Sequence, residues 1–226
     1  MKNGMLFGRN ERPFGLKWEE WAALWCSWML SIPKKNNPSL DNTGMYCSVN
    51  QRNANVWFLT GTFGNIIPVT RKCAIPAGRA IFFPILEKED SFAEDSDLTT
   101  ELELANRSKS ATDELVDMEV IIDGIRIEMI KDYRVQSNIF DLEFPEDNVY
   151  DVNPGLTRSV CDGYWIFLKP LPPGKHQIYF KGETRLVEKN TIARIRCAEV
   201  FSQIQKQINN NSTFKLAVSY ELDITN

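Results

Sequence analysis

Histidine is nearly absent from this chain of 226 residues, because His176 is the only one. Mechanisms that need a pair of histidines from one chain are therefore excluded, and these include most zinc hydrolases. A Ser/His/Asp or Cys/His arrangement would have to use His176. This residue follows a Pro-Pro-Gly turn at the start of an expected strand, where a polar side chain is ordinary. We expect no catalytic role for it.

Several other signatures are missing. The chain contains neither a GxGxxG nor a Walker pattern, so nothing in it indicates a phosphate-binding loop. No apolar run approaches the ~20 residues of a membrane-spanning helix. The net charge of −4 and the pI of about 5.2 do not favour binding to nucleic acid or to an anionic membrane. We expect neither partner.

The five cysteines contain no CxxC pair, which argues against a structural zinc site. An odd number of cysteines scattered through apolar stretches favours reduced, buried thiols, with one or two disulfides as the alternative. The residues are Cys26, Cys47, Cys73, Cys161 and Cys197.

The first fifteen residues are polar and glycine-rich and do not resemble a secretory signal. This predicts a cytoplasmic protein. A chain whose leader had been removed would look the same, so secretion is the alternative.

A tryptophan stripe predicts a helix over residues 18–32. Trp18, Trp21, Trp25 and Trp28 recur at the spacing of one helix face. We expect the helix to cover the open face of a sheet, with these rings as its seal. The alternative is an exposed aromatic platform for sugars or for a partner protein.

Most of the remaining chain has a β pattern. Asp123-Gly124 between two alternating runs predicts a hairpin, and Pro172-Pro173-Gly174 between runs 164–168 and 176–181 predicts another. The fold class is therefore mainly β: an antiparallel β-sandwich (jelly-roll or Ig-like) of roughly eight to ten strands, forming a single domain over 1–226. Further strands are expected at 55–60, at 66–72 as its return strand, at 79–86, within 133–144 and at 214–224, whereas 192–208 fits strand or helix.

Residues 87–103 are strongly acidic and separate two β regions. Residues 97–116 are expected to be a helical insertion, with Asp97 as the N-cap of a helix over 98–109 and a second short helix at 111–116. Asp90 and Glu94 are candidate ligands for Ca²⁺, which takes several oxygens. The run does not match the EF-hand pattern, and a solvated, flexible loop is the simpler interpretation.

A carboxylate pair for glycoside hydrolysis could also be drawn from this run together with Asp41 or Asp162. The chain holds 30 acidic residues, so some pair can always be found, and the signal is weak. Asp162-Gly163 is interpreted first as a turn.

The order of several blocks resembles a family of uncharacterised microbial proteins with no assigned function. The blocks are the tryptophan helix, Val56-Trp57-Phe58-Leu59-x-Gly61-Thr62, Pro76-Ala77-Gly78 with Phe82-Phe83-Pro84, and Asp162-Gly163-Tyr164-Trp165 leading to Pro172-x-Gly174-x-His176. The similarity spans nearly the whole chain. It implies a single domain and supplies no catalytic residues.

On function, the sequence favours a non-enzymatic binding or interaction module with a carbohydrate or protein ligand, because no catalytic set is present. The candidate ligand-binding residues are Asp41, Trp57, Tyr164 and Trp165. A carboxylate-based or metal-dependent hydrolase is the first alternative, and a structural or assembly protein is the second. No catalytic residue is assigned, and no cofactor is expected apart from the Ca²⁺ considered above.

Overall fold

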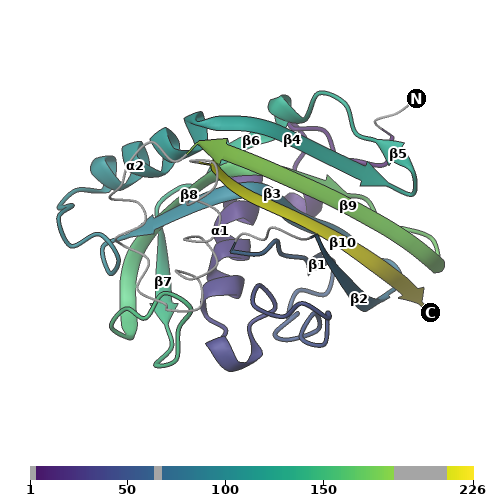
Figure 1. The fold of residues 1–226 in the computed structure, drawn as a ribbon, viewed down its shortest axis with the longest axis horizontal. Helices are drawn as coiled ribbons and strands as arrows, with labels where there is room; N and C mark the ends of the chain where they lie inside the picture. Colours follow the sequence, from purple (N-terminus) through teal and green to yellow (C-terminus); the bar gives the residue numbers. More distant parts are fainter. Residues whose placement is uncertain (1–3, 64–67, 186–212) are drawn as a thin grey trace.

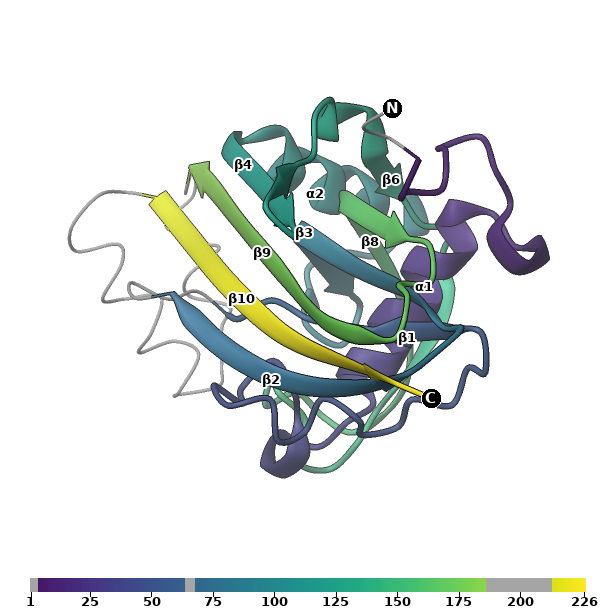
Figure 2. The same cartoon turned by 90° about the vertical axis from the view of Figure 1, so that its right-hand side faces the viewer.

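The computed structural model describes residues 4–63, 68–185 and 213–226. Within these residues ten strands form two five-stranded sheets (Figures 1 and 2), so the expected mainly β sandwich is confirmed. Sheet A has the order β1 (Val56–Phe58), β3 (Ala80–Ser91), β8 (Gly155–Leu168) and β6 (Arg134–Gln136), and β7 (Phe140–Phe144) also pairs with β8. Sheet B has the order β2 (Val69–Pro76), β10 (Thr213–Thr225), β9 (Gly174–Arg185), β4 (Leu115–Ile122) and β5 (Ile125–Arg126).

Most neighbouring strands are antiparallel, but β1 runs parallel to β3 and β2 runs parallel to β10. The prediction that 66–72 returns alongside 55–60 is therefore wrong, because β1 lies in sheet A and β2 lies in sheet B. The connection from residue 59 to residue 68 is long enough to cross between the sheets. A two-residue hairpin turn would have kept both strands together.

The Asp123-Gly124 hairpin is confirmed, since Ile122 pairs with Ile125 and both turn residues have positive φ (49° and 77°). The hairpin predicted around Pro172–Gly174 is wrong. β8 and β9 belong to different sheets, and the chain crosses between the sheets at residues 169–173. Three of these five residues are prolines, which have no N–H to extend a strand ladder. Asp162 and Gly163 are not a turn either, because both lie inside β8.

The tryptophan helix α1 (Trp18–Leu30) covers the face of sheet A that points away from sheet B (Figure 2). Two neighbouring residues of β3 point to opposite faces of sheet A, one toward α1 and the other toward sheet B. Phe82 contacts Trp18 with ring centroids 6.1 Å apart, and Phe83 contacts Phe180 of sheet B at 4.9 Å. All four helix tryptophans are buried, at most 7% exposed. The helix therefore seals the sheet, as expected, and offers no exposed platform.

The expected insertion is one helix, α2 (Glu101–Asp113), and not two. Its cap is Thr100 in a capping box with Glu103, so Asp97 is not the cap. The helix packs on sheet A through hydroxyls: Ser108 donates to the carbonyl of Lys88 (2.7 Å) and Thr112 donates to that of Asp162 (3.0 Å). Three short 3₁₀ helices complete the described elements, at Pro13–Gly15, Lys34–Asn36 and Ile130–Tyr133.

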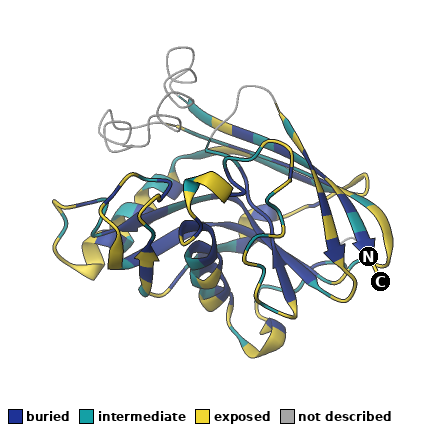
Figure 3. Ribbon diagram, turned by 90° about the horizontal axis from the view of Figure 1, so that it is seen from below, coloured by how far each residue is buried: buried dark blue, intermediate teal, exposed yellow. Residues whose placement is uncertain are grey.

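Buried residues gather along the central strands and on α1, and exposed residues lie in loops and at strand tips (Figure 3). One continuous apolar cluster joins both sheets and α1. In the described ranges no helix is long and apolar enough to cross a membrane. The segment 192–208 lies outside the described residues.

The expectation that every cysteine is reduced is wrong, because Cys47 and Cys73 form a disulfide. Cys26 and Cys161 are free thiols and fully buried, as expected for core cysteines. Cys197 lies outside the described residues. The disulfide joins the loop before β1 to the middle of β2, two segments that pass close together at Gly44 and Lys72.

Candidate functional site

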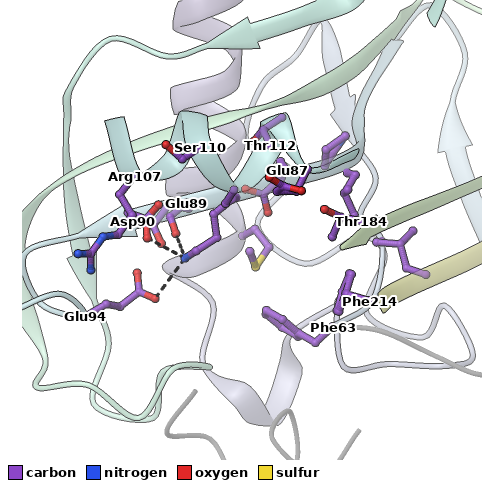
Figure 4. Close-up of a pocket in the computed structure, with 18 of the residues that line it drawn as sticks. Phe63, Glu87, Glu89, Asp90, Glu94, Arg107, Ser110, Thr112, Thr184 and Phe214 are labelled. Carbon is purple, nitrogen blue, oxygen red and sulfur yellow. Dashed lines mark hydrogen bonds and ion pairs between the residues drawn. The ribbon is translucent and has the colours of Figure 1, made fainter. Parts of the chain in front are cut away.

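A cavity of about 610 Å³ lies beside the second half of β3, between α1, α2 and the end of sheet B (Figure 4). Beyond Phe82, β3 pairs only with β8 among the described residues, so its other edge is not covered by a strand. Residues 84–90 of β3 line the cavity from this edge. The volume is within the range of small-molecule sites, about 300–1,000 Å³. We refer to it as the β3 cavity.

The walls of the β3 cavity differ in chemistry. Aromatic and aliphatic side chains from α1, from β10 and from two loops form an apolar part, and hydroxyls of α2 and β9 border the carboxyl groups of β3 (Figure 4). The apolar residues include Trp25, Met29, Phe63, Tyr150, Phe214 and Leu216, and the hydroxyls include Ser110, Thr112 and Thr184. An apolar pocket with a few convergent polar groups is typical of ligand sites.

The first part of the acidic run, residues 87–91, is not the solvated loop that the sequence favoured, whereas residues 92–100 do form a loop. Glu89 and Asp90 are 1% and 2% exposed. They are buried because β3 continues through these residues to Ser91, paired with β8 along its length, and because α2 packs against it. Lys88 supplies a positive charge among these carboxyl groups. Its Nζ lies 3.1 Å from Oδ1 of Asp90 and 3.9 Å from Oε1 of Glu94. The same Nζ donates a hydrogen bond to the carbonyl oxygen of Glu89.

Glu87 differs from its neighbours because its carboxyl group makes no hydrogen bond and no ion pair in the part of the chain that the structure describes. It is half-buried and lines the β3 cavity. Burial raises the pKa of Glu87 to about 7, with the ammonium of Lys88 opposing the shift and the carboxylate of Glu94 adding to it. A carboxyl group of this kind exchanges its proton near neutral pH.

Two further carboxyl groups on β3 resist ionisation. One oxygen of Glu89 accepts a hydrogen bond from Ser159, and the other receives none from an N–H or hydroxyl group within the described ranges, while the carboxyl group of Glu94 is within hydrogen-bonding reach of Glu89. Oδ2 of Asp90 has none either. Burial and the nearby Glu94 raise the pKa of Glu89 well above its usual range. Burial raises that of Asp90 to about 8, with Lys88 opposing the shift.

The Ca²⁺ hypothesis for Asp90 and Glu94 gains no support from this geometry. Among the described residues, no group of three His, Cys, Asp or Glu side chains is placed to hold a metal ion. Both carboxylates instead face the ammonium of Lys88, which lies where a cation would. The cavity does bring Asp90 and Glu94 together with Glu87 and Glu89.

The three aromatic candidates for ligand binding do not line the β3 cavity. Trp165 is fully buried and stacks on Phe82, with centroids 5.1 Å apart. Trp57 is 5% exposed and lies under the guanidinium of Arg79. Tyr164 is also buried, beneath Arg134. The ring faces of these residues are occupied by the core or by arginines of the same chain.

Asp41 also lies outside the cavity, and its carboxylate organises its own loop. It accepts hydrogen bonds from the backbone N–H (2.8 Å) and hydroxyl (2.7 Å) of Thr43 and from the N–H of Tyr46 (2.9 Å). Although partial burial acts to raise its pKa, these bonds and the nearby Arg71 hold the pKa of Asp41 below its usual value. The arrangement is a side-chain-capped turn.

His176 has both ring nitrogens engaged. Nδ1 lies 2.7 Å from Oδ2 of Asp123, and Nε2 lies 2.9 Å from the carbonyl oxygen of Pro172. Burial lowers its pKa, but these two contacts outweigh that and raise it. The ring ties the β4–β5 turn to the crossing segment before β9.

Sequence reasoning missed the residues that define the cavity. A signal for Glu87 and Glu89 was present, because Glu-Lys-Glu-Asp follows the apolar run 80–86 without a turn residue and could have been interpreted as one continuing strand. Phe63 and Tyr150 lie in loops far apart in the chain. Only the tertiary fold brings them to β3.

Comparison with protein-family models, with curated proteins and with solved structures finds no match to this chain. The resemblance to a family of microbial proteins stays a prediction. Proposals about function therefore start from the residues of the β3 cavity.

Proposed function

We propose that the protein is a binding module that takes a small molecule into the β3 cavity. The carboxyl group of Glu87 carries the proposal, because it lines the cavity and has no partner among the described residues. A buried polar group without a hydrogen bond costs roughly 1–3 kcal/mol. A ligand that bonds to Glu87 would recover this free energy, and functional sites are where such costs are tolerated.

The shape of the site supports a small ligand more than a protein surface. The cavity is concave and flanked by two helices, and its apolar side faces its carboxyl groups. A small molecule with an apolar body and a polar end fits both walls. The carbohydrate ligand expected from the sequence remains a candidate within this proposal, and its site would be the β3 cavity in place of Trp57 and Trp165.

A thermal-shift screen tests the proposal. Oligosaccharides, amines and nucleotides would be screened with the native protein and with Ala111→Trp, which places a large ring in the cavity wall without removing a carboxyl group. A ligand at 100 times its Kd stabilises by about 2.7 kcal/mol, which is about 5–10 °C for a chain of this length. The proposal requires a shift that Ala111→Trp abolishes. A shift that survives this substitution places the ligand elsewhere.

A carboxylate-based hydrolase is the second candidate, and one observation favours it. With a pKa of about 7, Glu87 is suited to general acid–base catalysis at neutral pH. Chromogenic glycosides and esters would be assayed with the native protein and with Glu87→Gln. Turnover that is lost in Glu87→Gln would move the proposal from binding to hydrolysis.

The disulfide bears on location. Disulfides persist mainly in oxidising compartments, so the Cys47–Cys73 bond favours the secreted alternative over the cytoplasmic one. Ligand screening under oxidising conditions is therefore the appropriate choice.

A further inference from the structure

We infer that the ligand of the β3 cavity is an organic ammonium cation with an apolar body. The inference rests on the small-molecule binding proposed above. Seven carboxyl side chains and three cationic side chains of the described residues line the cavity. Where such carboxyl groups ionise in a site of low dielectric, they attract a cation more strongly than they would in water.

The deepest carboxyl groups lack the partners that a cation would supply. Glu89 is 1% exposed and Asp90 is 2% exposed, and in the described part of the chain each keeps one oxygen that receives no hydrogen bond from an N–H or hydroxyl group. The carboxyl group of Glu87, which lines the same cavity, also keeps an oxygen without a donor. Lys88 is already bound to Asp90 and to the carbonyl of Glu89. The N–H donors of an ammonium group are what these oxygens lack.

Aromatic rings border the same space. Phe63 and Tyr150 both line the cavity, with ring centroids 6.0 Å apart and planes at 71°. Burial, followed by the charges of Glu94, Glu89 and Glu87, raises the pKa of the Tyr150 phenol well above its usual range. Ring faces attract cations, with larger effects away from water. Carboxyl groups and rings together suit an ammonium on an organic body.

Other classes of ligand would interact with only one of the two sides of the cavity, the carboxyl groups or the aromatic rings. A neutral sugar carries no charge that would favour the ionised form of these carboxyl groups. A bare metal ion would not contact the aromatic side, and no described group of three ligands is placed to hold one. The ammonium cation is the class that uses both sides of the cavity.

Isothermal titration calorimetry at pH 8 tests the inference with benzylamine, 1,4-diaminobutane and choline. Benzyl alcohol is the neutral counterpart of benzylamine, with the same shape and no charge. We expect at least one amine to bind, and the charged member of the benzyl pair to bind on the order of tenfold tighter or more. We expect Glu87→Gln and Glu89→Gln, which keep the side-chain size, to weaken the amine about tenfold and to leave benzyl alcohol unchanged.

The matched control is Glu143→Gln, which removes an exposed carboxylate on β7 that does not line the cavity. It should bind amines as the native protein does. Equal affinity for benzylamine and benzyl alcohol would overturn the inference, and this comparison needs no variant. If an oligosaccharide binds in the cavity and no amine does, the binding module stands and the ammonium inference fails. If no compound in the screen binds the native protein and loses that binding in Ala111→Trp, both the binding module and the ammonium inference fail.

Discussion

The guanidinium of Arg71 and the phenol of Tyr220 meet in the core, with Nη1 2.9 Å from the hydroxyl oxygen. Arg71 is 1% exposed, and its other bonds all go to backbone carbonyl oxygens. Three of these belong to Ser39, Thr60 and Gly61, which line the β3 cavity. One buried arginine on sheet B therefore holds two chain segments that line the cavity.

Replacing this arginine should destabilise the protein. Arg71→Met leaves the carbonyl oxygens of Ser39, Asp41 and Gly61 without their donor, at roughly 1–3 kcal/mol for each group that water does not reach. The carbonyl oxygen of Thr60 loses the arginine but keeps the hydroxyl of Tyr220. We expect a loss of at least about 3 kcal/mol in urea unfolding. Arg71→Lys, which keeps the charge but has fewer donors, should lose less. Equal losses for both variants would show that the hydrogen bonds are not the cause.

The Cys47–Cys73 disulfide should contribute about 2–4 kcal/mol by restricting the unfolded chain. Peptide mapping without reductant should recover one cross-linked peptide that contains both residues. The Cys47→Ser/Cys73→Ser protein should unfold at lower urea concentration than the native protein. Alkylation of both thiols in denaturant without reductant would disprove the bond.

The stability of the protein should fall as the pH rises from about 4.5 to 8. In the folded state the pKa of Glu87 is about 7 and that of Asp90 about 8, both above their ordinary values. The folded protein therefore binds more protons than the unfolded chain across this window. Each group lowers the free energy of unfolding by about 1.4 kcal/mol per pH unit at pH values where it is ionised only in the unfolded chain.

Urea unfolding at several pH values measures this dependence. Glu87→Gln should flatten it, because glutamine does not titrate, and Glu143→Gln should leave it unchanged. The groups around Glu87 that also titrate or carry charge are Lys88, Glu89, Asp90, Glu94, Tyr150 and Cys26. A stability that rises between pH 5 and pH 8 would contradict the account of the cavity.

Gly163 should tolerate no side chain. A Cβ at this position would lie 2.5 Å from the Cβ of Glu87 and 2.7 Å from the carbonyl oxygen of Leu86. Gly163→Ala should therefore push β3 away from β8, cost about 1–3 kcal/mol and weaken ligand binding. Gly8→Ala is the matched control, since its Cβ would meet only the side chain of Glu11 at 3.4 Å. Similar unfolding curves for the two variants would refute the argument.

Local patterns predicted the elements better than their partners. The tryptophan spacing specified α1 and its buried face, and Asp-Gly specified the β4–β5 turn, because both depend on residues close in sequence. Strand partners depend on where the chain crosses between sheets. The connections at 59–68 and 169–173 resemble turns in sequence, yet each joins two sheets.

The cavity could not be predicted from the sequence for a related reason. Charged residues at 87–90 are typical of a solvent-facing loop, and only their pairing with β8 and the cover provided by α2 bury them. The buried tryptophans attracted attention as binding residues because aromatic rings serve cores and ligand sites alike. Sequence spacing could not separate those two uses for Trp57 and Trp165, whereas burial does.

The most direct test of the account is the pKa of Glu87 in solution, measured by NMR from the side-chain carboxyl carbon of ¹³C-labelled protein, with Glu87→Gln to assign the signal. We expect a value of about 7 in the free protein, because burial disfavours the carboxylate. Saturating benzylamine should lower that value, because an ammonium ion favours the carboxylate. A value near 4.5 in the free protein, unchanged by any amine, would contradict the account.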